Sequence, residues 1–171
     1  MKDILRDPDK KKKHEFYEVW VKAHKENNIC ELFERTLPNI EISKSFVEFI
    51  SSRKVGIYHI YIMMKRNEQG HLIPLYIGKS KAPQSRWLQG HLKKLLAVDK
   101  GRINSSNYNN WLSNLNSINC TVYLMCVEQN KIKFPPIPGF PVSVGSIEYQ
   151  LISLAADAFD SSLLNSEGVA R

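Results

Sequence analysis

Two apolar segments in the middle of the chain are rich in β-branched and aromatic residues. The first, VGIYHIYIMM, covers residues 55–64, and the second, LIPLYIG, covers residues 72–78. Residues 67–70 between them are polar and end in glycine, which favours a turn, so the pattern predicts a β-hairpin. Pro74 has no N–H group to donate to a neighbouring strand, so the second strand should lie at a sheet edge or carry a bulge.

Helical patterns dominate on both sides of this hairpin. Residues 14–54 place apolar side chains at helical spacing, which predicts a layer of two or three helices. After the hairpin, leucines at helical spacing predict a helix from Ala82 to about Ala97. The rest of the pattern predicts a short helix near residues 108–116, a third strand at residues 120–127 and a last helix at about residues 145–159.

This order of elements predicts an α+β fold in which helices flank a small antiparallel sheet of about three strands. The helical residues before the hairpin are too few to bury a core of their own. We therefore divide the chain into an N-terminal helical extension, residues 1–54, and a domain at residues 55–171 that contains the sheet.

The positive charge of the chain is concentrated in one segment. The 171 residues include 24 Lys and Arg against 17 Asp and Glu, a net charge of +7. Residues 55–104 carry nine basic and two acidic side chains, whereas the segments before and after them are close to balance. A basic patch of this density attracts nucleic acid, although a solvated surface has the same composition. The separate run Lys10 to Lys13 is typical of a solvated tail.

Two classes of protein are excluded by composition. No apolar run approaches the ~18 residues that a membrane helix needs, and the charged start lacks the apolar stretch of a signal peptide. The three cysteines, Cys30, Cys120 and Cys126, are odd in number and lack C-x-x-C spacing, which argues against a disulfide framework and a zinc site. We expect a cytoplasmic protein without a membrane partner.

The predicted hairpin brings several polar side chains together. A turn centred within residues 67–69 places Tyr58 opposite a residue in the range 76–80, and cross-strand neighbours lie within ~5 Å at Cβ. Tyr76 and Lys79 therefore share one neighbourhood with Tyr58. Tyrosines are also common in strands simply because they pack well on a sheet.

Two other residues are candidates for contact with a ligand. Gly78, at the end of the second strand, permits close approach of a ligand to the backbone. Glu148 borders the apolar face of the last helix, whereas Asp157 lies on the opposite face. A carboxylate on the core-facing side needs a partner, a proton or a metal. Alternatively, Glu148 is a first-turn glutamate favoured by the helix dipole.

At these positions the sequence resembles the GIY-YIG nuclease family. Gly56-Ile57-Tyr58 matches the first tripeptide, Tyr76-Ile77-Gly78-Lys79-Ser80 contains the second, and Arg86-Trp87 follows at the expected place. Glu148 matches the helical glutamate of the family, and Asn165 in LLNSEG matches its terminal asparagine. The order and the expected strand or helix context agree over about two-thirds of the chain.

Three features depart from the family pattern. Seventeen residues separate Tyr58 from Tyr76, which is longer than the usual linker. Many members carry a histidine four residues after the arginine, but here His91 follows Arg86 by five, which is about 100° further round an α-helix. The segment before Glu148 is also long.

The resemblance implies a phosphodiesterase that cuts DNA with a divalent metal, Mg²⁺ or Mn²⁺. Glu148 would hold the metal, which binds through one or two carboxylates and keeps several waters. Arg86 would hold the scissile phosphate by paired hydrogen bonds, and Tyr58 would act as the general base or position the water.

The remaining matched residues would support this chemistry. Tyr76 and Lys79 would orient the phosphate and polarise Tyr58, and Asn165 would fix the metal ligand or the chain behind it. The basic segment would supply further DNA contacts through Lys81, His91, Lys93 and Lys94.

The first functional hypothesis is a DNA endonuclease of restriction, defence or mobile-element type. A nuclease that repairs branched or damaged DNA is the nearer alternative. A different class is a nucleic-acid-binding or interaction subunit without catalysis, against which the complete set of matched residues argues. Residues 1–54 would then serve as the surface for a partner protein or for a second copy of the chain.

Overall fold

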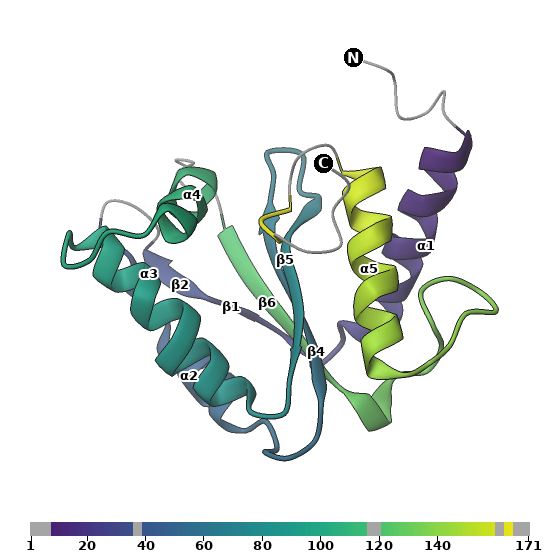
Figure 1. The fold of residues 1–171 in the computed structure, drawn as a ribbon, viewed down its shortest axis with the longest axis horizontal. Coiled ribbons are helices and arrows are strands. Elements are labelled where there is room, and N and C mark those ends of the chain that lie inside the picture. The colour runs from purple at the N-terminus through teal and green to yellow at the C-terminus, as the bar shows by residue number, and fades with distance from the viewer. Residues whose placement is uncertain (1–7, 36–38, 116–120, 160–162, 166–171) are drawn as a thin grey trace.

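A four-stranded antiparallel sheet forms the centre of the structure, with helices on both of its faces (Figure 1). The computed structural model describes residues 8–35, 39–115, 121–159 and 163–165. Across the sheet the strand order is β1-β6-β4-β5. In chain order these strands are β1 (Ile29–Glu31), β4 (His59–Arg66), β5 (Leu72–Ser80) and β6 (Thr121–Glu128).

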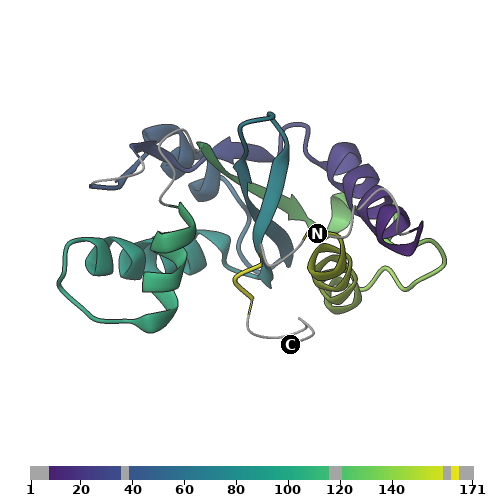
Figure 2. The same ribbon diagram turned by 90° about the horizontal axis from the view of Figure 1, so that it is seen from above.

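Two groups of α-helices in the described part of the chain enclose this sheet (Figure 2). One face is covered by α2 (Lys44–Ser51), α3 (Leu92–Asp99) and α4 (Ser106–Leu115). The other face is covered by α1 (Pro8–His24) and α5 (Val144–Ala158). Smaller elements are the strand pair β2 (Phe33–Arg35) and β3 (Glu41–Ile42), the π-helix η2 (Ser85–His91) and the 3₁₀-helix η3 (Gln129–Lys131). This arrangement confirms the α+β class.

Strand β4 is buried on both faces, which explains its uninterrupted apolar sequence. Ile60 and Ile62 belong to the core formed with α1 and α5. Tyr61 and Met63 belong to the core formed with α2, α3 and α4. Successive side chains of a strand point to opposite faces, so a central strand between two helical layers needs apolar residues at every position.

The prediction of a purely helical N-terminal segment is wrong where the chain forms strands β1, β2 and β3. Strand β1 pairs with β6, with Cys30 opposite Leu124, and adds a fourth strand to the sheet. Residues from before position 54 also contribute to both cores, so the predicted division there does not separate two cores. Such short strands are stabilised by pairing with a segment far away in sequence, which local periodicity does not report.

The basic run near the start is also part of the fold. Lys10 to Lys13 lie in the first turns of α1, so the tail interpretation is wrong. Lys13 Nζ lies 2.6 Å from a carboxylate oxygen of Asp157 in α5. The run therefore belongs to the helix that packs against α5.

The hairpin prediction is confirmed, including the position of its proline. Strand β5 is an edge strand, and its register with β4 shifts by one residue after Pro74. Pro74 lies opposite Met64 and Tyr76 lies opposite Met63, which leaves Leu75 as the extra residue of a β-bulge. This shift sets the positions of all residues at the far end of β5.

Two of the three cysteines lie in the described parts of the chain. Cys30 and Cys126 are free thiols, and burial raises the pKa of Cys126 to about 12. Cys120 lies outside the described residues. Within the described chain, we find no helix with the length and apolar character that crossing a membrane requires.

Candidate active site

A polar pocket with a volume of about 490 Å³ lies at the edge strand β5. Its lining comes from the residue before β4, from β4 itself, from β5, from η2, from α5 and from the segment at residues 163–165. All six residues predicted to be catalytic line this pocket: Tyr58, Tyr76, Lys79, Arg86, Glu148 and Asn165. The fold thus brings these separate parts of the chain to one place.

The β-bulge changes which residue lies beside Tyr58. His59 is opposite Ser80, so continuing the register places Tyr58 beside Lys81, one residue beyond the predicted range 76–80. The ammonium of Lys81 lies 4.9 Å from the centroid of the Tyr58 ring. The predicted range was wrong because it assumed a hairpin without the extra residue at Leu75.

Glu148 has a charged partner in the pocket. Its carboxylate accepts a hydrogen bond from the ammonium of Lys79, and its side chain is 21% exposed. We expected a carboxylate on this face to have a partner, a proton or a metal, and the structure shows a charged partner, Lys79. No acidic residue occupies the first turn of α5, because Glu148 is in the second turn, so the helix-dipole alternative does not apply.

The donors around Glu148 are compatible with a hydrated divalent cation. No three His, Cys, Asp or Glu side chains in the described ranges come together as a ligand set. Mg²⁺ binds through as few as one carboxylate and keeps its waters, and this pocket offers one carboxylate and tyrosine hydroxyls in a wide polar space. Lys79 then competes with the cation for the same carboxylate.

Arg86 lies beside a tyrosine that the sequence analysis missed. Tyr61 is 1% exposed, and its ring packs edge-on against Trp87 with centroids 5.2 Å apart. Hydrogen bonding to Tyr61, with a smaller contribution from Tyr76, raises the pKa of the Arg86 guanidinium. Burial raises the pKa of Tyr61, which keeps its hydroxyl neutral. Arg86 is otherwise exposed, so its remaining donors are available to a ligand.

Gly78 makes room for this tyrosine. It lies opposite Tyr61, and a Cβ atom at position 78 would be 2.5 Å from the Tyr61 hydroxyl oxygen. The missing side chain thus has a packing role, and Gly78 also lines the pocket, so the predicted approach of a ligand to its backbone stays a prediction. A tyrosine opposite a cross-strand glycine could in principle be predicted from the hairpin register. The bulge at Leu75 shifts that register by one residue, so a regular hairpin does not place Tyr61 opposite Gly78.

A π-helical turn absorbs the extra residue between Arg86 and His91. At the end of η2 the N–H of Leu92 bonds to the carbonyl of Trp87, five residues earlier. This wider turn carries His91 back towards the Arg86 face, and its ring lies 5.1 Å from the Tyr76 ring. The predicted displacement of 100° assumed a regular α-helix and is wrong.

His91 cannot contact DNA directly as predicted, because it is only 8% exposed. Its Nδ1 atom shares a 2.9 Å hydrogen bond with the Tyr108 hydroxyl, and its ring stacks on Trp111. Burial, with the nearby charge of Arg86, lowers the pKa of His91 to about 4. The other predicted DNA contacts are exposed: Lys81, Lys93 and Lys94.

Asn165 binds the backbone of the edge strand. Its Oδ1 accepts a hydrogen bond from Ile77 N at 3.0 Å, and its Nδ2 donates to Ile77 O at 2.7 Å. Leu164 N also donates to Leu75 O at 2.6 Å. These contacts match the alternative in which Asn165 fixes the chain behind the site.

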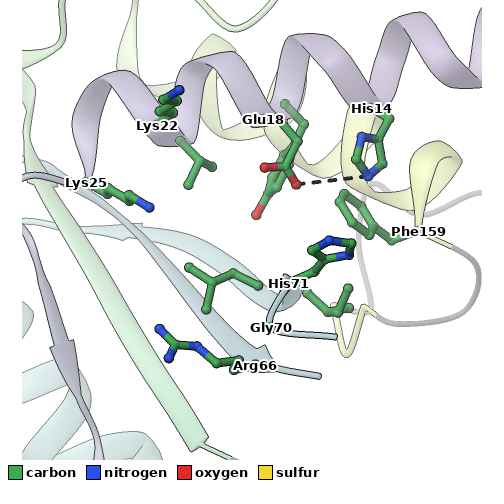
Figure 3. Close-up of a pocket in the computed structure, with 12 residues that line it drawn as sticks. His14, Glu18, Lys22, Lys25, Arg66, Gly70, His71 and Phe159 are labelled. Atoms are coloured by element: carbon green, nitrogen blue, oxygen red, sulfur yellow. Dashed lines mark ion pairs between the residues drawn. The ribbon is translucent and has the colours of Figure 1, made fainter. Parts of the chain in front are cut away.

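A second pocket, of about 430 Å³, lies between α1 and the hairpin turn (Figure 3). It contains the His14–Glu18 pair, with atoms 4.0 Å apart, and His71 faces that pair across it. None of the residues predicted for the site lines this pocket.

No protein-family model, no curated protein and no solved structure matches this chain. The chemistry of the site is therefore inferred from its own residues and their geometry.

Gly78→Ala should destabilise the protein by about 1–3 kcal/mol, because the new methyl group collides with the packed Tyr61 ring. Urea unfolding measures the loss. Gly90→Ala is the matched control, because a Cβ there meets only Ser85 O at 3.8 Å, and it should be neutral or stabilising. Equal stability of Gly78→Ala and the wild type would contradict the packing of Tyr61 against Gly78.

The buried imidazole of His91 should make stability depend on pH. The unfolded chain binds a proton near pH 6.5 and the folded chain only near pH 4, so stability is complete above pH 6.5 and falls as pH drops towards 4. The loss from His91 alone should be about 3 kcal/mol. In urea unfolding between pH 7.5 and 4.5, His91→Phe should lose less stability than the wild type.

The matched control is His71→Phe, at an exposed histidine. His24 and His59 also have pKa values lowered by burial and contribute in the same pH range, so the comparison uses differences between variants. An identical pH profile for His91→Phe and His71→Phe would contradict the assignment.

Proposed function

We propose that this protein is a divalent-metal-dependent endonuclease of the GIY-YIG type that hydrolyses phosphodiester bonds in DNA. The observation that carries the proposal is the convergence of the six matched residues on one pocket at the end of the hairpin. Five separated parts of the chain supply them, and a packing arrangement without a function gives no reason for that coincidence.

The charges in the pocket suit a phosphodiester together with a cation. Lys79 and Arg86 are positive, and Glu148 is the one carboxylate among the described lining residues. Arg86 is exposed, and the neighbouring hydroxyls of Tyr61 and Tyr76 raise the pKa of its guanidinium. A charged guanidinium at this place can donate paired hydrogen bonds to phosphate oxygens.

Tyr58 is the residue best placed to handle the proton of the attacking water. It lines the pocket together with Glu148, and the Lys81 ammonium over its ring holds it beside the end of β5. Its hydroxyl would accept a proton from the water or orient it, which is general-base catalysis or positioning. Tyr76 would contact the same phosphate through its hydroxyl.

Glu148 would hold Mg²⁺ or Mn²⁺, which supplies stabilisation of charge on the leaving oxygen. Lys79 would give up its place on the carboxylate and contact the phosphate instead. Asn165 acts behind the site, where its amide holds Ile77 between Tyr76 and Gly78.

Glu148→Gln should abolish cleavage and leave DNA binding within a few-fold of wild type, because it removes the carboxylate that would hold the metal. The assay is incubation of the purified protein with duplex, single-stranded and branched DNA plus Mg²⁺, with and without EDTA. Asp157→Asn is the control, an acid on the same helix outside the pocket. Normal cleavage by Glu148→Gln, or cleavage in EDTA, would refute the metal-dependent mechanism.

Arg86→Ala should lower the cleavage rate by ~10² or more, because a donor to the charge of the transition state is lost. Arg86→Lys should restore little of this rate, since a point charge cannot reproduce the planar fork. Tyr61→Phe should cause a smaller loss, because it keeps Arg86 and removes only the hydroxyl that fixes it. Single-turnover kinetics separates these effects from binding. Full activity of Arg86→Lys would show that position 86 needs only a positive charge, and it would contradict the paired hydrogen bonds to phosphate.

A further inference from the structure

A polar groove lies at the end of the sheet where β4 begins and β6 ends. Two adjoining hollows of about 220 Å³ and about 420 Å³ share Asn28 and Lys131 in their walls, and we treat them together as one groove. We call it the basic groove, after the four cations that line it: Arg53, Lys54, Lys131 and Lys133.

The basic groove begins next to the candidate active site. The carbonyl of Tyr58 accepts a 2.9 Å hydrogen bond from Gln129 N, the first residue of η3. Tyr58 lines the candidate site, and the following residue, His59, lines the basic groove. In Figure 1 the start of β4, the end of β6 and the first turn of α5 lie together at the lower end of the sheet.

Two of the four cations are held by neutral acceptors rather than by carboxylates. Arg53 donates from Nε to Phe49 O at 3.2 Å and from Nη1 to Asn28 Oδ1 at 3.3 Å. Lys133 Nζ donates to Ala23 O at 3.3 Å. A neutral acceptor fixes the position of a cation and leaves its charge uncompensated, which is the arrangement that a bound anion requires.

Acidic residues offset only part of this charge. Glu128 is 8% exposed, and its carboxylate lies 3.8 Å from Lys54 Nζ. Glu26 is the other acid among the described lining residues of the basic groove. The four cations therefore exceed the acids by two.

The wall of the groove is preformed by a buried histidine. His24 is 3% exposed, and its Nε2 accepts a 2.9 Å hydrogen bond from Lys133 N. Its Nδ1 lies 2.7 Å from Trp20 O and donates to that carbonyl, so both ring nitrogens are occupied by the neutral form. This link ties the segment after η3 to α1 and holds Lys133 in place before any ligand binds.

We propose that the basic groove binds the phosphate backbone of the DNA beyond the position where the strand is cut. The proposal rests on the proposed function, which places a phosphodiester at Tyr58. A polar groove with several cations suits a polyanion, and its position next to that site, at the residue after Tyr58, favours the same DNA molecule over an acidic protein. The charge here comes from residues on both sides of the basic segment at residues 55–104 and not from that segment itself.

The test is the salt dependence of DNA binding, measured by fluorescence anisotropy with a labelled duplex in EDTA, where no cleavage occurs. Lys131→Gln with Lys133→Gln removes two cations and keeps most of their stems. This variant should bind DNA ~10-fold or more weakly at low salt, and its salt slope should be smaller by up to about two units. Lys44→Gln with Lys100→Gln removes the same charge at two exposed positions elsewhere and should change affinity less than about twofold.

An unchanged salt slope in the groove variant, or an equal loss in the control pair, would overturn the proposal. Displacement of DNA from the wild type by polyglutamate but not from the groove variant would assign the groove to acidic proteins instead. A thermal melt checks that both variants are folded, and Lys131→Ala alone replaces the double variant if that one melts early. If the groove variant shows the predicted smaller salt slope but the wild type cuts no DNA, the groove proposal is supported and the nuclease proposal fails. If the wild type cuts DNA but the groove variant keeps the wild-type salt slope, the nuclease proposal is supported and the groove proposal fails.

Discussion

The structure depends on the position of β4 between β5 and β6, with helices packed against both of its faces. Such a strand exposes neither backbone edge nor face to water, so its pairing determines the register of both neighbours. The candidate site lies on the edge strand β5, where the backbone can still bind another segment. Asn165 uses that edge and encloses the pocket from the far end of the chain.

Two irregularities of a single residue shape the site within this frame. The bulge at Leu75 turns Tyr61 towards Gly78 and sets Tyr58 beside Lys81. The π-helical turn of η2 then keeps Arg86 and the buried histidine behind it on one side of the strand. Each irregularity interrupts a regular hydrogen-bond pattern, and both change the positions of residues around the Arg86 guanidinium.

The electrostatics of the molecule follow from how its cations are held. Lys79 is paired with Glu148 in the pocket, so the metal ion proposed for this site would compete with the ammonium for the same carboxylate. In the basic groove, by contrast, Arg53 and Lys133 are bound to neutral acceptors and keep their charge available. The first arrangement suits exchange of partners during a reaction, and the second suits steady contact with a polyanion.

The sequence by itself determined the elements whose stability is local or whose pattern is long. They include the hairpin, the edge position of Pro74, and the helices, among them the last helix with Glu148 on its inner border. Periodicity and proline chemistry act within a few residues, so the sequence shows these elements directly. Only the tertiary structure decided the role of β1, the one-residue shift that brings Tyr61 to Arg86, and the gathering of distant cations into the basic groove. Each of these depends on pairing between segments far apart in sequence, and the free energy of such contacts leaves no trace in local composition.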